Sequence, residues 1–243
     1  MAAYSERGVH GQTVQLLGER VVSGRIAEGE TIDLAALSGE LDLSLTAIRE
    51  AIRVLGAKGL VGSRQRKGTY VRPRSDWNLL DPDVVKWQVA AGAGEAFFRN
   101  LAELRGALEP TAARLAALRR TEDHVAQLRA AVRDIAETHD SSPEDAAESD
   151  LRWHRALLAA TGNELYTRSD IFISAGLIER DRLVHSGTHK DPVPSHTAVT
   201  EAVAAGDPAA AESAMRSLLE QADEDLLRAA GDDAPHDGLE RPE

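Results

Sequence analysis

The chain of 243 residues has no cysteine and few aromatic side chains. Without cysteine it can form no disulfide and use no thiol nucleophile, which excludes a disulfide scaffold and cysteine-based catalysis. A reducing cytoplasm is the compartment that we expect for such a chain. Aromatic residues make up only 4%, while alanine, leucine, arginine and glutamate dominate. That composition favours helices throughout the chain.

Long apolar runs are also missing. No stretch approaches the ~20 apolar residues that a membrane-spanning helix requires, and residues 1–12 lack the apolar core of a signal peptide. The motifs of three large enzyme classes are absent as well: the His-Glu-x-x-His zinc motif, the Gly-x-Ser-x-Gly nucleophile elbow and the phosphate-binding loop. We therefore expect a cytoplasmic protein that makes no membrane contact and is not an enzyme of these classes.

The most informative segment runs from Ser44 to Pro73. Its first half predicts a helix that ends at Gly59, because apolar residues recur three and four positions apart and form one stripe. The members of this stripe are Ile48, Ala51, Ile52 and Leu55. The Ser44 hydroxyl can cap this helix by accepting a backbone N–H of the first turn. Arg49 and Arg53 lie off the stripe, one turn apart on an exposed edge.

A short basic hairpin follows this helix. Residues 60–63 and 69–72 predict two strands, and the tip between them consists of Arg64, Gln65, Arg66, Lys67 and Gly68. A helix sized for the major groove with a cationic hairpin beside it is the winged helix-turn-helix arrangement of DNA-binding proteins. The residues that we expect to contact DNA are Ser44, Thr46, Arg49, Arg53, Arg64, Arg66, Lys67 and Gly68.

Charge is distributed unevenly along the chain. The formal net charge is -12, yet the segment from Arg49 to Arg74 holds eight basic residues and one acidic residue. The positive field therefore lies where DNA phosphates would be met, and the acidic remainder has no reason to touch DNA. The alternative is a solvated basic face on an ordinary small domain, but helix, hairpin and charge agree on DNA binding.

The chain divides into two parts joined by a linker. Helices at 9–23 and 34–41 precede the recognition helix and complete a winged helix-turn-helix domain over residues 1–73. Residues 74–83 break the helical periodicity and are predicted to be the linker.

The second part, residues 84–230, contains only helical patterns, so the predicted fold class is mainly α with a two-stranded wing. We expect an all-helical bundle of about six to seven helices, at 84–91, 95–119, 122–138, 143–161, 163–186, 194–205 and 207–230. Pro110 is expected to kink or divide the second of these helices. Residues 231–243 are predicted to be a disordered tail.

Several local motifs occur together with this order of parts. They are TAIREAIRVLGAKGLV with RKGTYV, then ELRGALEPTAARLAA at 103–117, DLRWH at 150–154, ATGNELY at 160–166 and SHTAVTEAVAAGDPAAAESAM at 195–215. Together they resemble the GntR family of bacterial transcription regulators, in the subgroup with an FCD-type effector domain. The linker segment WNLLDPDVVKW at 77–87 is similar to the sugar-acid branch of that subgroup, which includes galactonate-operon repressors.

The resemblance implies a ligand-responsive DNA-binding regulator. It implies a repressor that binds a double-stranded DNA operator as a homodimer and is released by a small hydroxy-carboxylate such as a sugar acid. Residues 84–230 would then bind the effector and dimerise. Two arginines that the family commonly places near DNA are replaced here by Ala35 and Leu45, so the family's operator sequence cannot be carried over.

A pocket in the helical part is indicated by Asp150 and His154, which lie four residues apart and so share one helix face. Such a carboxylate–imidazole pair is either half of a metal site or a surface hydrogen bond. The resemblance implies two further histidine ligands from later helices. His196 matches the first of them, but the second falls at Leu218. A divalent zinc, nickel or manganese ion, or a sugar acid bound directly by hydrogen bonds, would fit this set.

Arg105 matches the arginine of the family's Glu-Leu-Arg motif, which often faces the effector. It can bind a carboxylate in bidentate fashion, or it can form a salt bridge to Glu109 four residues on. The predicted effector-binding residues are Arg105, Asp150, His154 and His196, of which the last three are the predicted metal ligands. The alternative function is a helical metal-dependent hydrolase that carries a DNA-binding domain.

Overall fold

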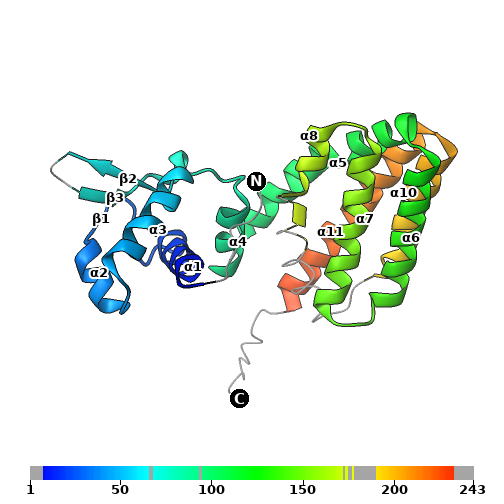
Figure 1. The fold of residues 1–243 in the computed structure, drawn as a ribbon. Coiled ribbons are helices and arrows are strands. Elements are labelled where there is room, and N and C mark those ends of the chain that lie inside the picture. Colours follow the sequence, from blue (N-terminus) through cyan, green and yellow to red (C-terminus); the bar gives the residue numbers. More distant parts are fainter. Residues whose placement is uncertain are drawn as a thin grey trace, which may run out of the picture. The chain divides into compact units, whose positions relative to one another are not determined.

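The structure, a computed structural model, describes residues 8–65, 68–92, 95–171, 173, 174, 177 and 190–232. The chain forms two compact units, Met1–Glu95 (unit 1) and Ala96–Glu243 (unit 2), whose ribbons are drawn in Figure 1. Helices dominate both units, and the sheet found among the described residues has three short strands in unit 1. The prediction of a mainly α chain with a winged helix-turn-helix is confirmed.

Unit 1 begins with the predicted helices, α1 (Val9–Val22), α2 (Leu34–Glu40) and α3 (Leu45–Ala57). The Asp33 carboxylate caps α2 by accepting the N–H groups of Ala35 and Ala36. The Ser44 hydroxyl caps α3 by accepting the N–H of Ala47 at 3.1 Å, as the sequence predicts. The apolar stripe of α3 faces the core, with Ile48, Ala51 and Leu55 fully buried and Ile52 half-buried.

The wing is a three-stranded antiparallel sheet with the strand order β1-β3-β2, formed by β1 (Thr31–Ile32), β2 (Val61–Arg64) and β3 (Gly68–Val71). The sequence predicted only the last two strands, because two residues are too few to show an alternating pattern. Val61 and Val71 oppose each other and are buried. The alternate positions, Gly62, Arg64 and Tyr70, therefore share the outer face. Two predicted DNA contacts, Arg66 and Lys67, lie outside the described residues.

The predicted linker, residues 74–83, is not an irregular loop throughout. It contains the short helix η1 (Arg74–Asp76) and leads into α4 (Pro82–Ala90), which packs against α1. Trp87 is 1% exposed, and its Nε1 donates to Gln15 Oε1 at 2.7 Å. The indole lies so close to Gly18 that a Cβ there would come within 2.6 Å of the ring. Unit 1 thus extends beyond residue 73, where the DNA-binding domain was predicted to end, and the helix that the sequence assigned to the second domain packs on the first.

Lys58, which follows the last residue of α3, ties the recognition helix to the start of α4. Its Nζ lies 2.7 Å from Asp81 Oδ1 and 2.6 Å from Asp83 Oδ2, and 5.9 Å from the centre of the Trp87 ring. Asp81 also caps α4 by accepting the N–H groups of Asp83 and Val84. Burial alone would lower the pKa of Lys58, but the two carboxylates outweigh it and raise that pKa. The ammonium therefore stays charged and holds α3 and α4 together.

Unit 2 consists of helices in its described part, namely α5 (Glu95–Arg119), α6 (Glu122–Thr138), α7 (Pro143–Ala160), α8 (Glu164–Arg168), α10 (Val193–Ala205) and α11 (Pro208–Asp232). Pro110 does not divide α5, which continues through it as one helix. The predicted helix 163–186 is interrupted, because α8 stops at Arg168 and Ser169 forms its cap, and helical residues resume at 170, 171, 173, 174 and 177. Residues 178–189 and 233–243, which include most of the predicted tail, lie outside the described residues.

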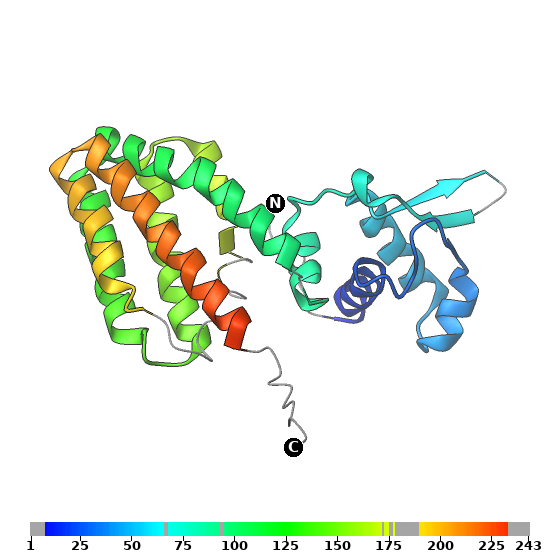
Figure 2. The ribbon, with the colours of Figure 1, turned by 180° about the vertical axis from the view of Figure 1, so that it is seen from behind.

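The core of unit 2 is built from small and aliphatic side chains around one tryptophan. Trp153 of α7 is fully buried, and its Nε1 donates to Thr200 Oγ1 of α10 at 2.9 Å. Helices α10 and α11 pack side by side, as the view from behind in Figure 2 shows. Among the described residues, no helix combines the length and the apolar character that a membrane crossing requires.

Candidate DNA interface and effector site

The exposed edge of α3 carries the predicted DNA-contacting residues. Ser44, Thr46, Arg49 and Arg53 are all exposed, while the opposite side of the helix is buried in the core. Arg53 Nη1 donates to both Glu50 carboxylate oxygens at 2.8 and 2.9 Å. Within the described part of the chain Arg49 makes no such ion pair. The structure thus places these side chains on one surface, and their contact with DNA stays a prediction.

The outer face of the wing has a feature that the sequence analysis missed. The guanidinium of Arg64 lies 4.0 Å from the centre of the Tyr70 ring. The two residues are diagonal neighbours, because Arg64 pairs with Gly68 and Tyr70 pairs with Gly62. A Cβ on Gly62 would lie only 3.1 Å from the Tyr70 ring, so glycine leaves room for the ring. The stack holds the guanidinium in one place on the surface.

We expect Tyr70 to contribute to DNA binding through Arg64. Exposed cation–π contacts contribute about 0.5–1 kcal/mol, so separate Arg64→Ala and Tyr70→Ala changes should be coupled by about two- to fivefold in Kd. A double-mutant cycle of operator affinity measures this coupling, and Tyr70→Phe, which keeps the ring, serves as the matched control. Strictly additive losses would show that the stack has no role in binding.

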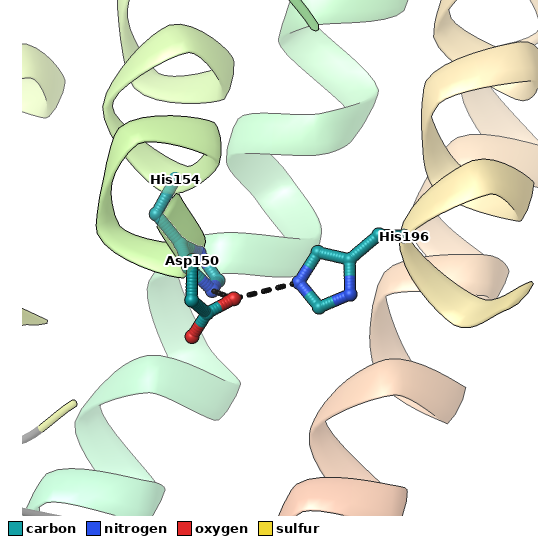
Figure 3. Close-up of side chains that lie close together, drawn as sticks. All are labelled: Asp150, His154 and His196. Carbon is teal, nitrogen blue, oxygen red and sulfur yellow. Dashed lines mark hydrogen bonds and ion pairs between the residues drawn. The ribbon is translucent and has the colours of Figure 1, made fainter. Parts of the chain in front are cut away.

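The predicted pocket residues of unit 2 converge in the structure. Asp150 and His154 come from α7 and His196 from α10, and Figure 3 shows the three side chains pointing toward one another. Asp150 Oδ1 lies 2.8 Å from His196 Nε2 and 3.7 Å from His154 Nε2. One ligand atom from each residue falls within 4.8 Å of the others. Both imidazoles are buried, with 2% and 4% exposed.

The ring of His196 has a defined orientation. Its Nδ1 lies 2.8 Å from the carbonyl oxygen of Pro192. A carbonyl only accepts, so Nδ1 carries a proton and Nε2 faces Asp150. Nε2 and a carboxylate oxygen at 2.8 Å need a proton or a metal cation between them, because two lone pairs repel.

A second carboxylate, Glu109 of α5, completes the group. It is 0% exposed, and its Oε1 accepts from Arg105 Nε at 2.6 Å. Its Oε2 lies 3.0 Å from His154 Nδ1. Burial alone would raise the pKa of Glu109, but the charge of Arg105 and the contact with His154 lower that pKa to about 2. Glu109 is therefore an anion at neutral pH.

Of the two roles that the sequence left open for Arg105, the structure shows the salt bridge to Glu109, and binding of an effector carboxylate stays a prediction. Arg105 Nη2 also lies 3.4 Å from His154 Nε2. The side chain is 5% exposed. The sequence anticipated the salt bridge from the spacing of four residues, but it gave no sign that Glu109 also reaches His154 across the helix pair.

The donor set fits a divalent ion. One carboxylate oxygen and two imidazole nitrogens are common zinc and nickel ligands, and each histidine has its other ring nitrogen bonded to an oxygen acceptor, as metal-binding histidines usually do. Leu218, at the position where the resemblance implies a fourth ligand, is 4% exposed and packs in the apolar core. The described residues thus offer three ligands, with a guanidinium nearby.

The fold combines a winged helix-turn-helix with a helical domain that holds a buried cluster of charged and polar side chains. The FCD domain family matches residues 100–221, and the family described as bacterial regulatory proteins of the gntR family matches residues 10–71. The chain therefore belongs to the GntR family, with an FCD domain after its winged helix. The prediction of a transcription regulator is confirmed.

Relatives that match most of the chain are transcription regulators as well. The galactonate operon transcriptional repressor of Escherichia coli is 31% identical over 84% of this chain and 90% of its own length. LutR of Bacillus subtilis, an HTH-type transcriptional regulator, is 30% identical over 85% of this chain and 95% of its own. These relatives and both families are transcription regulators, so the hydrolase alternative finds no support.

Solved structures share the fold. The Listeria monocytogenes protein Lar covers 93% of this chain and 99% of its own at a TM-score of 0.59 and 16% identity. Escherichia coli McbR/YncC covers 92% and 99% at a TM-score of 0.54 and 13% identity. At such identities the likeness concerns the fold alone.

Proposed function

We propose that this regulator is a repressor whose operator complex is released by a small hydroxy-carboxylate, most simply an aldonic or related sugar acid. The observation that carries the proposal is the buried Arg105 beside the Asp150, His154 and His196 group. A buried guanidinium binds a carboxylate through two parallel hydrogen bonds. The neighbouring carboxylate and imidazoles suit the hydroxyl groups of a sugar acid.

The same three residues are proposed to hold a divalent ion such as zinc, nickel or manganese. When bound, that ion would supply positive charge for the effector's carboxylate and leave coordination positions for its oxygens. The name of the Escherichia coli relative, a galactonate operon repressor, supports a sugar acid. If no metal is present, Asp150 and the two histidines would bind the effector's hydroxyl groups directly.

DNA binding is assigned to α3 and the wing, through Ser44, Thr46, Arg49, Arg53, Arg64, Arg66, Lys67 and Gly68. One winged helix contacts too few bases for operator-level affinity, so we propose a homodimer that reads two half-sites. The helical domain is the dimerising part in this proposal, because the acidic part of the chain has no reason to approach DNA.

The proposal predicts that D-galactonate or a related aldonate abolishes a gel shift made with DNA from upstream of the protein's own gene. The same acid should raise the melting temperature of the protein, because ligands that bind the folded state stabilise it. Sedimentation of the free protein at micromolar concentration should give a dimer. A fatty acyl thioester that raises the melting temperature while every sugar acid fails would contradict the effector assignment.

A further inference from the structure

Glu109 is the one buried carboxylate of the described site that contacts two of its functional side chains at once. Its Oε1 accepts from Arg105 at 2.6 Å, and its Oε2 lies 3.0 Å from His154 Nδ1. An ionised carboxylate only accepts hydrogen bonds, so the proton in the second contact sits on Nδ1 of His154. Arg105 and Glu109 lie on α5 and His154 on α7, so this contact joins two helices.

A separate contact requires the same form of His154. Arg105 Nη2 lies 3.4 Å from His154 Nε2. A guanidinium has donors and no acceptor, so Nε2 must be the bare nitrogen of the ring. Arg105, Glu109 and His154 thus contact one another pairwise, and both contacts of His154 require the same tautomer. In this arrangement the one lone pair of Nε2 accepts from Arg105, and Asp150 Oδ1 lies 3.7 Å from the same nitrogen.

We propose that Glu109 is a positioning residue of the effector site, which fixes His154 in its Nδ1-protonated form and anchors the guanidinium of Arg105. The inference deepens the proposed function, because it gives Glu109 a role in preparing His154 and Arg105 for the ligand. The tautomer itself is a property of the protein without any ligand, so it can be tested separately.

Loss of Glu109 would change both partners. A free histidine side chain favours the proton on Nε2, and His154 in that form would place an N–H, in place of a bare nitrogen, where Arg105 now donates. Arg105 would lose the Glu109 carboxylate as a partner of its buried guanidinium, and breaking a buried ion pair is unfavourable. Removing the acceptor behind a metal-binding histidine typically lowers metal affinity about 10- to 100-fold.

The direct test is nitrogen NMR of the full-length, chelator-treated protein with 15N-labelled histidine. Protonated and bare ring nitrogens resonate far apart, and the signals of His154 among the eight histidines are assigned by their loss in His154→Gln. We expect the parent protein to show a protonated Nδ1 and a bare Nε2. Glu109→Met should shift the proton toward Nε2, while Glu109→Gln, which keeps an acceptor oxygen of the same reach, should retain the parent form.

Glu103→Met is the matched control, because it makes the same change on the exposed side of the same helix. A second measurement is zinc affinity by competition with a chelating dye, where Glu109→Met should lose about 10- to 100-fold and Glu103→Met should match the parent. Circular dichroism checks that each variant is folded.

The result that overturns the inference is a parent protein with the His154 proton on Nε2, and this outcome stands even if Glu109→Met fails to fold. An unchanged tautomer in a folded Glu109→Met would overturn it as well. Failure of the sugar acids and of zinc to bind the parent protein would instead contradict the proposed effector or metal, while the tautomer measurement would still decide the role of Glu109.

Discussion

Replacing Arg49 by alanine is expected to weaken operator binding by about 5- to 150-fold, because an arginine that reads a base in the major groove discriminates by about 1–3 kcal/mol. Arg49 is exposed on the edge of α3 whose opposite side is buried. The loss should be largest for the operator and small for a shuffled sequence of the same length. Fluorescence anisotropy titrations with both DNAs measure this difference.

Two further variants make the test specific. Arg53→Ala should cost less than Arg49→Ala, because the Arg53 guanidinium is already engaged by Glu50 at 2.8 Å. Arg133→Ala removes the same charge from an exposed position of α6 and should leave affinity unchanged. If Arg49→Ala binds the operator as tightly as the parent, the assignment of α3 to the groove is wrong.

Changing Leu218 to histidine is expected to raise bound zinc or nickel from a substoichiometric amount toward one ion per chain. The described residues of the parent offer three ligands, and Leu218, at the position where the family resemblance implies a fourth, packs in the apolar core. The Arg105 guanidinium, 3.4 Å from His154 Nε2, adds repulsion to any cation there. A histidine at position 218 would add a third imidazole as the fourth ligand and offset this repulsion.

Elemental analysis after dialysis against a weak chelator measures the occupancy. Leu219→His is the matched control, since Leu219 is the next residue of α11 and is also buried. Leu219→His should be destabilised by its buried imidazole as Leu218→His is, but its bound metal should not increase. His154→Ala should abolish whatever metal the parent binds. A full, chelator-resistant equivalent of metal in the parent would show that another side chain supplies the fourth ligand.

The sequence predicted those features that depend on neighbours along the chain. The cap at Ser44 and the buried stripe of α3 follow from local spacing, and the structure has them where they were expected. The convergence of His196 with Asp150 came instead from the family resemblance, because residues 46 positions apart carry no local signal of contact.

Other features depend on contacts between distant segments, and these the sequence did not reveal. The packing of α4 on α1 depends on Trp87, which fills the space at Gly18. Neither residue taken by itself in the sequence indicates that contact. A glycine inside a helix is nevertheless a usable signal, because it is unfavourable there and often marks a close approach. The Arg64–Tyr70 stack could be read only once the strand register was known.

The packing of α4 on α1 also determines at which residue the DNA-binding unit can be joined to a different effector domain. Exchange of effector domains at Pro73, the end of the wing, would separate Lys58 from Asp81 and Asp83 and remove the indole that covers Gly18. The DNA-binding unit would then expose the surface around Gly18 that Trp87 now covers, and Lys58 would lose both of its carboxylate partners. A junction beyond α4 would keep both contacts inside one module. Chimaeric sensors built from this chain, and any natural exchange of effector domains, should therefore carry the segment after the wing together with the DNA reader.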